Sequence, residues 1–133
     1  MILELNMSSD MPIYIQLRNQ IVMGIGSGEL KAGQGLPTVR QLAEDIGINM
    51  MTVSKAYNIL KNEGYIEIDR RHGAKVREGF VNSRQFTEKL EAELSLLAAE
   101  SKAMGMNKKA FLEICERKFN DMNIKKLGEQ SKC

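Results

Sequence analysis

The strongest constraint on this fold is a pair of short helical patterns on either side of a tight turn, within residues 36–65. Thr38 can cap the first helix and begins a capping box there. Apolar residues then recur at helical spacing up to Gly47, a residue suited to a helix end that needs a positive φ. Asn49 can cap the second helix, which we expect to end at Gly64. Two helices joined by a short turn that contains Gly are typical of the helix-turn-helix motif.

We expect the second helix to have one apolar face and one polar face. The predicted buried stripe consists of Val53, Ala56, Tyr57 and Leu60. Because this stripe already fills the inner face, Met50 and Met51 should lie exposed at the start of the helix. In a helix-turn-helix, the second helix enters the DNA major groove and presents its first side chains to base edges. The motif therefore predicts DNA contacts near the start of this helix.

After the second helix the hydrophobic period changes from helical to two. Residues 65–69 and 74–77 both alternate, which predicts a small β-hairpin. The turn between them consists of Arg70, Arg71, His72 and Gly73. A hairpin directly after a helix-turn-helix is a wing, and this one carries the densest basic cluster in the chain. A tight tip with Arg suits a narrow DNA minor groove, whereas the alternative is a solvated turn.

Bulk charge does not indicate a nucleic-acid binder. The 133 residues include 19 basic and 17 acidic residues, for a net charge of +2. Residues 1–78 carry nine basic and nine acidic residues. A DNA-binding surface would therefore depend on local segregation of charge rather than on an excess of it.

The sequence offers no constellation for catalysis or for a metal. Cys115 and Cys133 lie far apart without metal-ligand spacing, and His72 cannot complete a Cys/His cluster locally. We expect no metal, no cofactor and no enzymatic activity, because paired carboxylates, an activated nucleophile and a phosphate-binding glycine loop are all missing. The cysteines fit a reduced, cytoplasmic setting. No segment approaches the roughly 18 apolar residues of a membrane span.

Residues 1–78 are predicted to form one domain and residues 79–133 a helical tail. The tail should contain a helix from Phe86, a turn capped by Asn107, and a second helix to about Met122, followed by a frayed polar end. One pair of short helices is too small to bury both of its apolar stripes, so we expect a homodimer joined as a bundle of four helices. We also expect Cys115 to be a buried small hydrophobe. The predicted interface consists of Phe86, Leu90, Leu94, Leu97, Phe111, Leu112, Cys115 and Phe119.

Four segments carry a resemblance to a known family. They are PIYIQL at residues 12–17, LPTVRQLA at 36–43, TVSKAY at 52–57 and EGYI at 63–66. Over about residues 11–78 this combination resembles the GntR family of bacterial transcription regulators, and the short helical tail resembles its YtrA-like branch. The resemblance implies a mainly α fold with a small β-hairpin, in which a winged helix-turn-helix domain precedes a two-helix dimerisation tail. It also implies a repressor that binds a palindromic operator as a dimer, in that branch often an operator of membrane transporter genes.

The recognition helix departs from the family pattern at its start. Many members have Ser-Arg ahead of the Thr-Val pair, and the short branch often has Asn-Pro-Asn, whereas this chain has Asn49, Met50 and Met51. Met can touch a thymine methyl but cannot make the bidentate bonds of Arg to guanine. The family position of Arg40 implies a DNA contact; the alternative is an exposed Arg, or a partner for Glu44. The predicted DNA-binding residues are Thr38, Arg40, Asn49, Met50, Met51, Thr52, Lys55, Arg70, Arg71, His72 and Gly73.

Two functional classes fit these features. The first is a dimeric regulator that binds double-stranded DNA, and the alternative is a winged-helix module that binds RNA or a protein partner. The basic wing and the polar outer face of the second helix favour DNA. The 55 residues after the wing are too few for a dedicated ligand-binding domain, so we expect no small-molecule effector domain.

Overall fold

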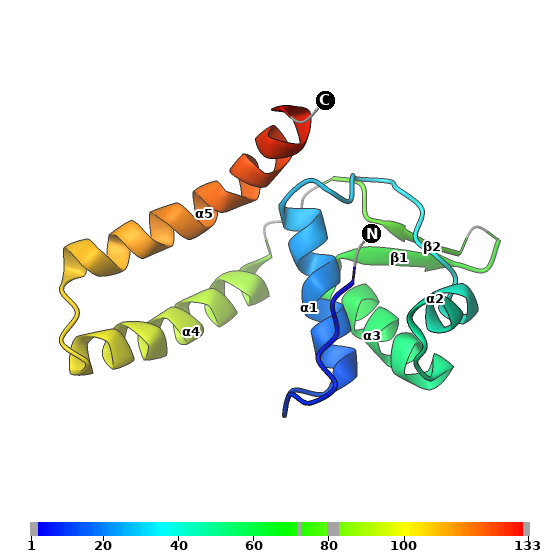
Figure 1. Ribbon diagram of the computed structural model, residues 1–133, viewed down its shortest axis with the longest axis horizontal. Helices are drawn as coiled ribbons and strands as arrows, with labels where there is room; N and C mark the ends of the chain where they lie inside the picture. The colour runs from blue at the N-terminus through cyan, green and yellow to red at the C-terminus, as the bar shows by residue number, and fades with distance from the viewer. Residues whose placement is uncertain (1–2, 72, 80–82, 132–133) are drawn as a thin grey trace. The chain divides into compact units, whose positions relative to one another are not determined.

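The computed structural model describes residues 3–71, 73–79 and 83–131, with side chains as far as Met122. The chain divides into two compact units, Met1–Glu78 and Gly79–Cys133. The first contains the helix-turn-helix and the hairpin, and the second contains the helical tail (Figure 1).

The first unit is a winged helix-turn-helix. Its elements are α1 (Ile13–Gly26), α2 (Val39–Ile46), α3 (Met50–Glu63), β1 (Ile66–Asp69) and β2 (Gly73–Val76). The strands are antiparallel, with Ile66 opposite Val76. Both α1 and α2 pack against α3, and the hairpin follows α3 directly (Figure 1). The predicted fold, mainly helical with one small hairpin, is confirmed.

The turn between α2 and α3 is determined by local residues, as predicted. The Thr38 hydroxyl accepts a hydrogen bond from the Gln41 amide at 3.0 Å and so caps α2. Gly47 ends that helix with a φ of 70° in the left-handed region, which residues with a Cβ adopt at a cost. The Asn49 side chain accepts from the Met51 amide at 2.7 Å and caps α3. Each cap satisfies an amide that the helix itself leaves unpaired.

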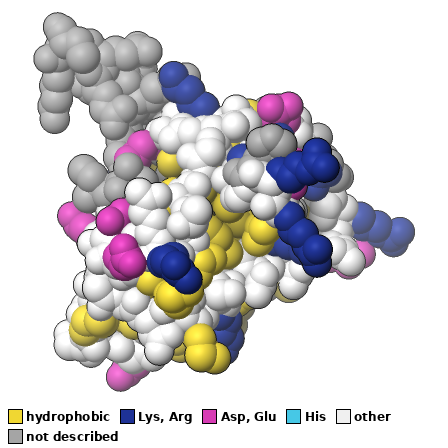
Figure 2. Space-filling model, turned by 90° about the vertical axis from the view of Figure 1, so that its right-hand side faces the viewer, with side chains coloured by type: hydrophobic (Ala, Val, Ile, Leu, Met, Phe, Trp, Pro, Cys, Tyr) yellow, Lys and Arg dark blue, Asp and Glu magenta, His cyan; other side chains and the backbone are white. Residues whose placement is uncertain are grey.

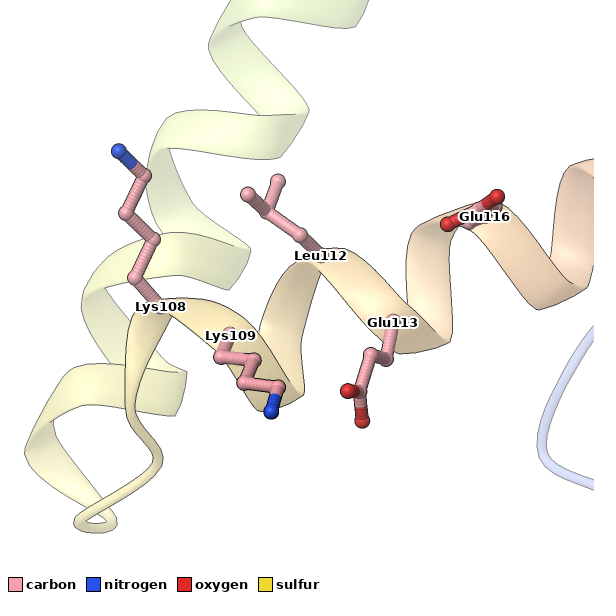
Figure 3. Close-up of a pocket in the computed structure, with 5 residues that line it drawn as sticks. All are labelled: Lys108, Lys109, Leu112, Glu113 and Glu116. Carbon is pink, nitrogen blue, oxygen red and sulfur yellow. The ribbon is translucent and has the colours of Figure 1, made fainter.

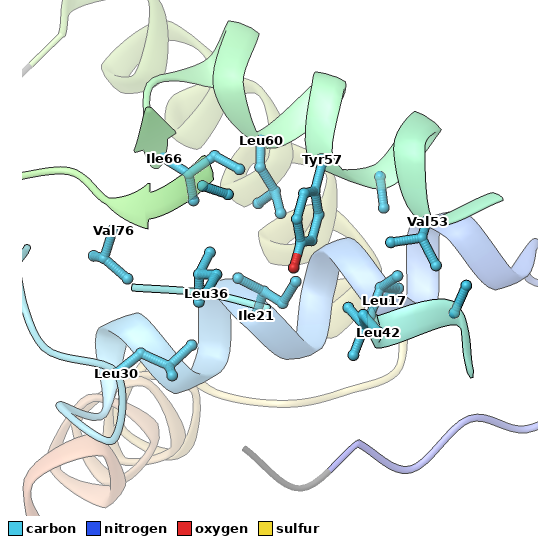
Figure 4. Packing of buried hydrophobic residues seen from close by; sticks show 13 residues of the cluster. Leu17, Ile21, Leu30, Leu36, Leu42, Val53, Tyr57, Leu60, Ile66 and Val76 are labelled. Carbon is cyan, nitrogen blue, oxygen red and sulfur yellow. The ribbon is translucent and has the colours of Figure 1, made fainter. Parts of the chain in front are cut away.

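The hydrophobic core of the winged unit lies where its three helices meet the hairpin (Figure 4). All four residues of the predicted stripe on α3 are buried in it, which determines the face that α3 turns to solvent. The buried cluster consists of Leu17, Ile21, Leu30, Leu36, Leu42, Ala43, Val53, Ala56, Tyr57, Leu60, Ile66, Ala74 and Val76.

Residues 3–12 form an arm that is tied to α1 by hydrogen bonds. Gln16, which is buried, donates to the carbonyls of Asn6 and Met11 at 3.0 and 2.8 Å. Its side-chain oxygen accepts from the Asn6 amide at 2.8 Å. Helix α1 begins after Pro12 without a side-chain cap, and the nearby Ser8 and Ser9 hydroxyls make hydrogen bonds within the arm instead.

The second unit consists of α4 (Arg84–Ala103) and α5 (Lys108–Ser131), joined by a turn. Ser83 caps α4 by accepting from the Phe86 amide at 3.0 Å, so this helix begins two residues before the predicted start. Asn107 accepts from the Ala110 amide at 2.8 Å, and this predicted cap is confirmed.

Two expectations about the second unit were wrong. Helix α5 continues to Ser131 rather than ending near Met122. Its last turns are rich in Lys, Glu and Gln, which favour helix without needing an apolar stripe. Cys115 is exposed in the single chain rather than buried, because no other element of the unit covers its face of α5.

Candidate nucleic-acid interface

The outer face of α3 lies opposite its buried stripe and carries side chains that protrude into solvent. Met51, Lys55 and Asn58 are spaced four and three residues apart, so they share one side of the helix. All three are exposed. Met50 and Met51 are 45% and 79% exposed, which confirms that neither belongs to the core. Thr52, by contrast, is half-buried.

Tyr57 orients α3 against the segment that enters α2. Its ring is almost fully buried, and its hydroxyl donates to the Pro37 carbonyl at 2.7 Å. Burial raises the pKa of Tyr57 to about 12, because the phenolate would lose its hydration there. The expectation that Tyr57 packs inward rather than facing a ligand is confirmed.

The start of α2 presents Thr38 and Arg40 to solvent. Thr38 is occupied as the helix cap, so its hydroxyl already accepts one hydrogen bond. No carboxylate of the described residues pairs with Arg40, and the alternative of an ion pair with Glu44 is therefore not formed. The Arg40 guanidinium remains available to an anion.

The wing tip presents two exposed arginines, Arg70 and Arg71. The Arg71 amide donates to the Asp69 side chain at 2.8 Å, which stabilises the turn. Gly73 adopts a φ of 73°, in the left-handed region that glycine tolerates best. His72, which the sequence also placed in this turn, lies outside the described residues.

Two other basic side chains of this unit, Arg18 and Lys75, are paired with carboxylates. Arg18 from α1 bonds both carboxylate oxygens of Glu63 at 2.9 and 3.1 Å, and it also lies over the Tyr65 ring. Burial alone would lower the pKa of Arg18, but the hydrogen bond and charge of Glu63 raise it overall. The sequence did not predict this pair, because its members are 45 residues apart and on different helices.

Charge is segregated on the end of the winged unit that carries α2, the start of α3 and the hairpin tip. Figure 2 views this end, where most Lys and Arg side chains lie toward one edge and most carboxylates toward the other. A unit without net charge can therefore still offer a positive edge to a polyanion.

Other kinds of site find little support among the described residues. The hollow in Figure 3 is open and belongs to one helix, whereas ligand pockets are enclosed. Its lining consists of Lys108, Lys109, Leu112, Glu113 and Glu116. In the described ranges, no three His, Cys, Asp or Glu side chains gather as metal ligands. No helix in those ranges has the length and hydrophobicity to cross a membrane.

Comparisons with known proteins identify relatives over most of the chain. The model of the family "Bacterial regulatory proteins, gntR family" matches residues 13–76. The uncharacterized HTH-type transcriptional regulator YhcF of Bacillus subtilis is 30% identical over 106 residues, which are 79% of this chain and 88% of YhcF. The HTH-type transcriptional repressor YtrA of Bacillus subtilis is 41% identical over 57% of this chain and 58% of its own. For Rv1152, a regulator of Mycobacterium tuberculosis, the identity is 37% over 53% of this chain and 59% of that protein. The chain thus spans less than two thirds of the last two relatives.

Solved structures give the same result. YtrA from Sulfolobus acidocaldarius, a GntR-family transcription factor, is 35% identical with a TM-score of 0.64, over 74% of this chain and 99% of that one. The AraR DNA-binding domain, solved with its operator ORX1, is 25% identical with a TM-score of 0.51, over 56% of this chain and 95% of that one. The relatives are named as transcription regulators and not as enzymes. Together with the winged helix-turn-helix and its capped helix pair, these matches confirm the resemblance in the sequence: the chain belongs to the GntR family of bacterial regulatory proteins and is YtrA-like.

Proposed function

We propose that this protein is a homodimeric repressor that binds a palindromic operator through α3, the start of α2 and the wing tip. The observation that carries the proposal is the exposed, carboxylate-free outer face of α3 beside the exposed Arg40 and wing arginines. The name of the relative YtrA supports repression, and the AraR complex supports operator binding by a domain of this kind. The proposed contacts are Thr38, Arg40, Asn49, Met50, Met51, Thr52, Lys55, Arg70, Arg71, His72 and Gly73.

Each element has a physical role in this proposal. The start of α3 enters the major groove, where Met50 and Met51 offer apolar contact to thymine methyl groups. Arg40 binds the phosphate backbone and sets the register of the protein on the duplex. Arg71 at the wing tip reaches the minor groove, where a narrow width strengthens the negative potential.

The homodimer is proposed from the exposed apolar face of the second unit. No residue of α4 is buried, and Leu94, its least exposed large apolar side chain, is still 38% exposed. Phe119 on α5 is 79% exposed. Monomeric proteins rarely leave so large an apolar surface in water, and a second copy can cover it as a bundle of four helices. The proposed interface consists of Phe86, Leu90, Leu94, Leu97, Phe111, Leu112, Cys115 and Phe119.

The two-fold symmetry of such a dimer explains why the proposed operator is palindromic. An isologous dimer sets two copies of α3 on one side of the duplex, about 34 Å or a multiple of it apart, which requires a palindromic site. From the likeness to the YtrA branch we infer that membrane transporter genes are among the targets. The enclosed volume that a small-molecule effector needs could arise in this assembly only between the two copies.

The proposed contacts can be tested with Arg40→Ala and Arg71→Ala on an operator selected from a random DNA pool. Each variant should weaken binding in a gel-shift titration by about thirtyfold, because each dimer loses two charge-assisted contacts of about 1 kcal/mol. Arg84→Ala is the matched control, since Arg84 lies on α4 and pairs with Glu88 at 3.3 Å. Circular dichroism checks that each variant is folded. Unchanged affinity in both α2 and wing variants would refute these contacts.

A further inference from the structure

One exposed lysine of α3 is held by an aromatic ring from another helix. The Lys55 ammonium lies 3.9 Å from the centroid of the Tyr14 ring. Tyr14 belongs to the first turn of α1, and Lys55 lies in the second turn of α3. The two helices pack side by side (Figure 1), so the ring reaches the outer face of α3 from an adjacent element. Tyr14 is half-buried and packs against the core, which gives it a firm base.

The contact holds the lysine without neutralising it. Lys75 on the wing pairs with Glu67 at 3.8 Å, and Arg18 pairs with Glu63 at 2.9 Å. No carboxylate among the described residues pairs with Lys55. An aromatic face attracts a cation through its quadrupole but carries no net charge. The ammonium therefore keeps its full positive charge, and its N–H groups that point away from the ring remain free to donate.

A lysine fixed in this way binds an anion at a lower entropic cost. The free side chain has several rotatable bonds, and ordering them on binding is unfavourable. A ring that already restricts these rotamers reduces the cost before the anion arrives. On this face, beside Met51 and Asn58, the anion that approaches is a backbone phosphate of a duplex whose groove receives α3.

We propose that Tyr14 is a positioning residue that holds the Lys55 ammonium for a phosphate of bound DNA. This inference rests on the proposed function, and it adds α1 to the elements that form the interface. The ring acts through the lysine, so its face is what matters and its hydroxyl is dispensable.

The experiment uses the full chain and a fluorescent duplex of mixed sequence, because a phosphate contact does not depend on base sequence. Anisotropy titrations over a salt series compare the unchanged protein with Tyr14→Phe, Tyr14→Leu, Lys55→Met and the double variant Tyr14→Leu/Lys55→Met. Lys55→Met should reduce the slope of log K against log salt by about 0.9 for each lost contact. Tyr14→Leu should weaken binding about fivefold, because each copy would then have to order a freed lysine side chain when DNA binds. Tyr14→Phe, which keeps the ring, should bind like the unchanged protein.

The double variant separates positioning from support of the fold. If Tyr14 acts through Lys55, Tyr14→Leu has no further effect once Lys55 is Met. If Tyr14→Leu lowers DNA affinity equally with Lys55 present and with Lys55 replaced by Met, the ring supports the fold instead. That result would overturn the proposal. A Tyr14→Phe variant as weak as Tyr14→Leu would overturn it too, because the hydroxyl would then be the active group. Failure of the unchanged protein to bind both this duplex and any sequence selected from a random DNA pool would refute the proposed function itself, and this inference with it.

Discussion

Two methionines, Met50 and Met51, lie at the start of α3, just ahead of the Thr-Val pair of the family pattern. Met50 is 45% exposed and Met51 is 79% exposed, although the helix has a well-filled apolar face. Exposed Met is an unusual choice for a polar surface, and its flexible, polarizable side chain suits apolar contact with irregular partners. We therefore interpret both residues as determinants of base preference rather than of stability.

Replacing both methionines by Gln tests this interpretation. The free energy of unfolding should change by no more than about 0.5 kcal/mol, because neither side chain is in the core. Sequences selected from a random pool should shift toward adenine at the contacted positions, since Gln can pair with adenine in the major groove. Leu60→Gln, on the buried face of the same helix, is the contrasting control and should lower stability sharply. A comparable loss of stability in the variant with both methionines replaced would show that Met50 or Met51 supports the fold.

Tyr57 links stability to pH through its buried phenol. Its pKa in the folded protein is about 12, above the ordinary value of 10.0. The fold therefore favours the neutral phenol, and this stabilisation is complete below about pH 10 and lost as the pH rises through about 12. Tyr57→Phe should cost about 1 kcal/mol at neutral pH through loss of the hydrogen bond to Pro37. Urea titrations give the free energy of unfolding of the unchanged protein and of Tyr57→Phe. The difference between the two values should stay constant below about pH 9 and narrow by about 1 kcal/mol near pH 11. A difference that is independent of pH would contradict this account.

At the scale of elements, the connection between α3 and the wing is fixed both by a glycine at the end of the helix and by contacts with a distant residue of α1. Gly64 ends α3 with a φ of 91°. Beside it, Arg18 of α1 binds Glu63 in the last turn and lies over Tyr65, the residue that leads into β1. These contacts tie the end of the recognition helix to α1, so the wing leaves α3 in a defined direction.

Gly64→Ala should disturb this connection. A side chain in the left-handed region costs about 1–2 kcal/mol, so the variant should unfold earlier in thermal or urea denaturation. The added Cβ would also lie 3.2 Å from the Arg77 guanidinium and displace it. Gly35→Ala is the matched control, because a Cβ there meets nothing within 4 Å. Equal losses in both variants would show that the strain at Gly64 is not the cause.

At the scale of the whole molecule, the proposed dimer depends on the second unit. We expect light scattering to give a dimer for the full chain and a folded monomer for a version ending at Gly79. Loss of the paired recognition helices should weaken operator binding by about 10²-fold or more, because the second contact would no longer be intramolecular. Leu94→Glu in the full chain should also disrupt the dimer, whereas Ser95→Glu on the opposite side of α4 should not. A dimer that survives truncation, or a full-length monomer at micromolar concentration, would place the interface elsewhere.

Much of the winged unit follows from the sequence because its signals are local. The caps at Thr38 and Asn49, the glycine stops at Gly47 and Gly64, and the stripe on α3 each act within a few residues. The change of period after Gly64 likewise predicted the hairpin. The same local reasoning was wrong at the end of α5, where a polar segment expected to fray is helical.

Only the tertiary structure decided which distant side chains meet. Gln16 binding the N-terminal arm, Arg18 reaching Glu63, the Tyr57 hydroxyl on Pro37 and the Tyr14 ring under Lys55 all join residues that no periodic pattern connects. The last three of these contacts form because core packing brings α1 and α2 against α3, and hydrogen-bond and cation–π contacts act only at that short range. The sequence determined where the recognition helix begins, where it ends and which of its faces is buried. The packed core determined which side chains on its exposed face keep an unpaired charge and which neighbours hold them.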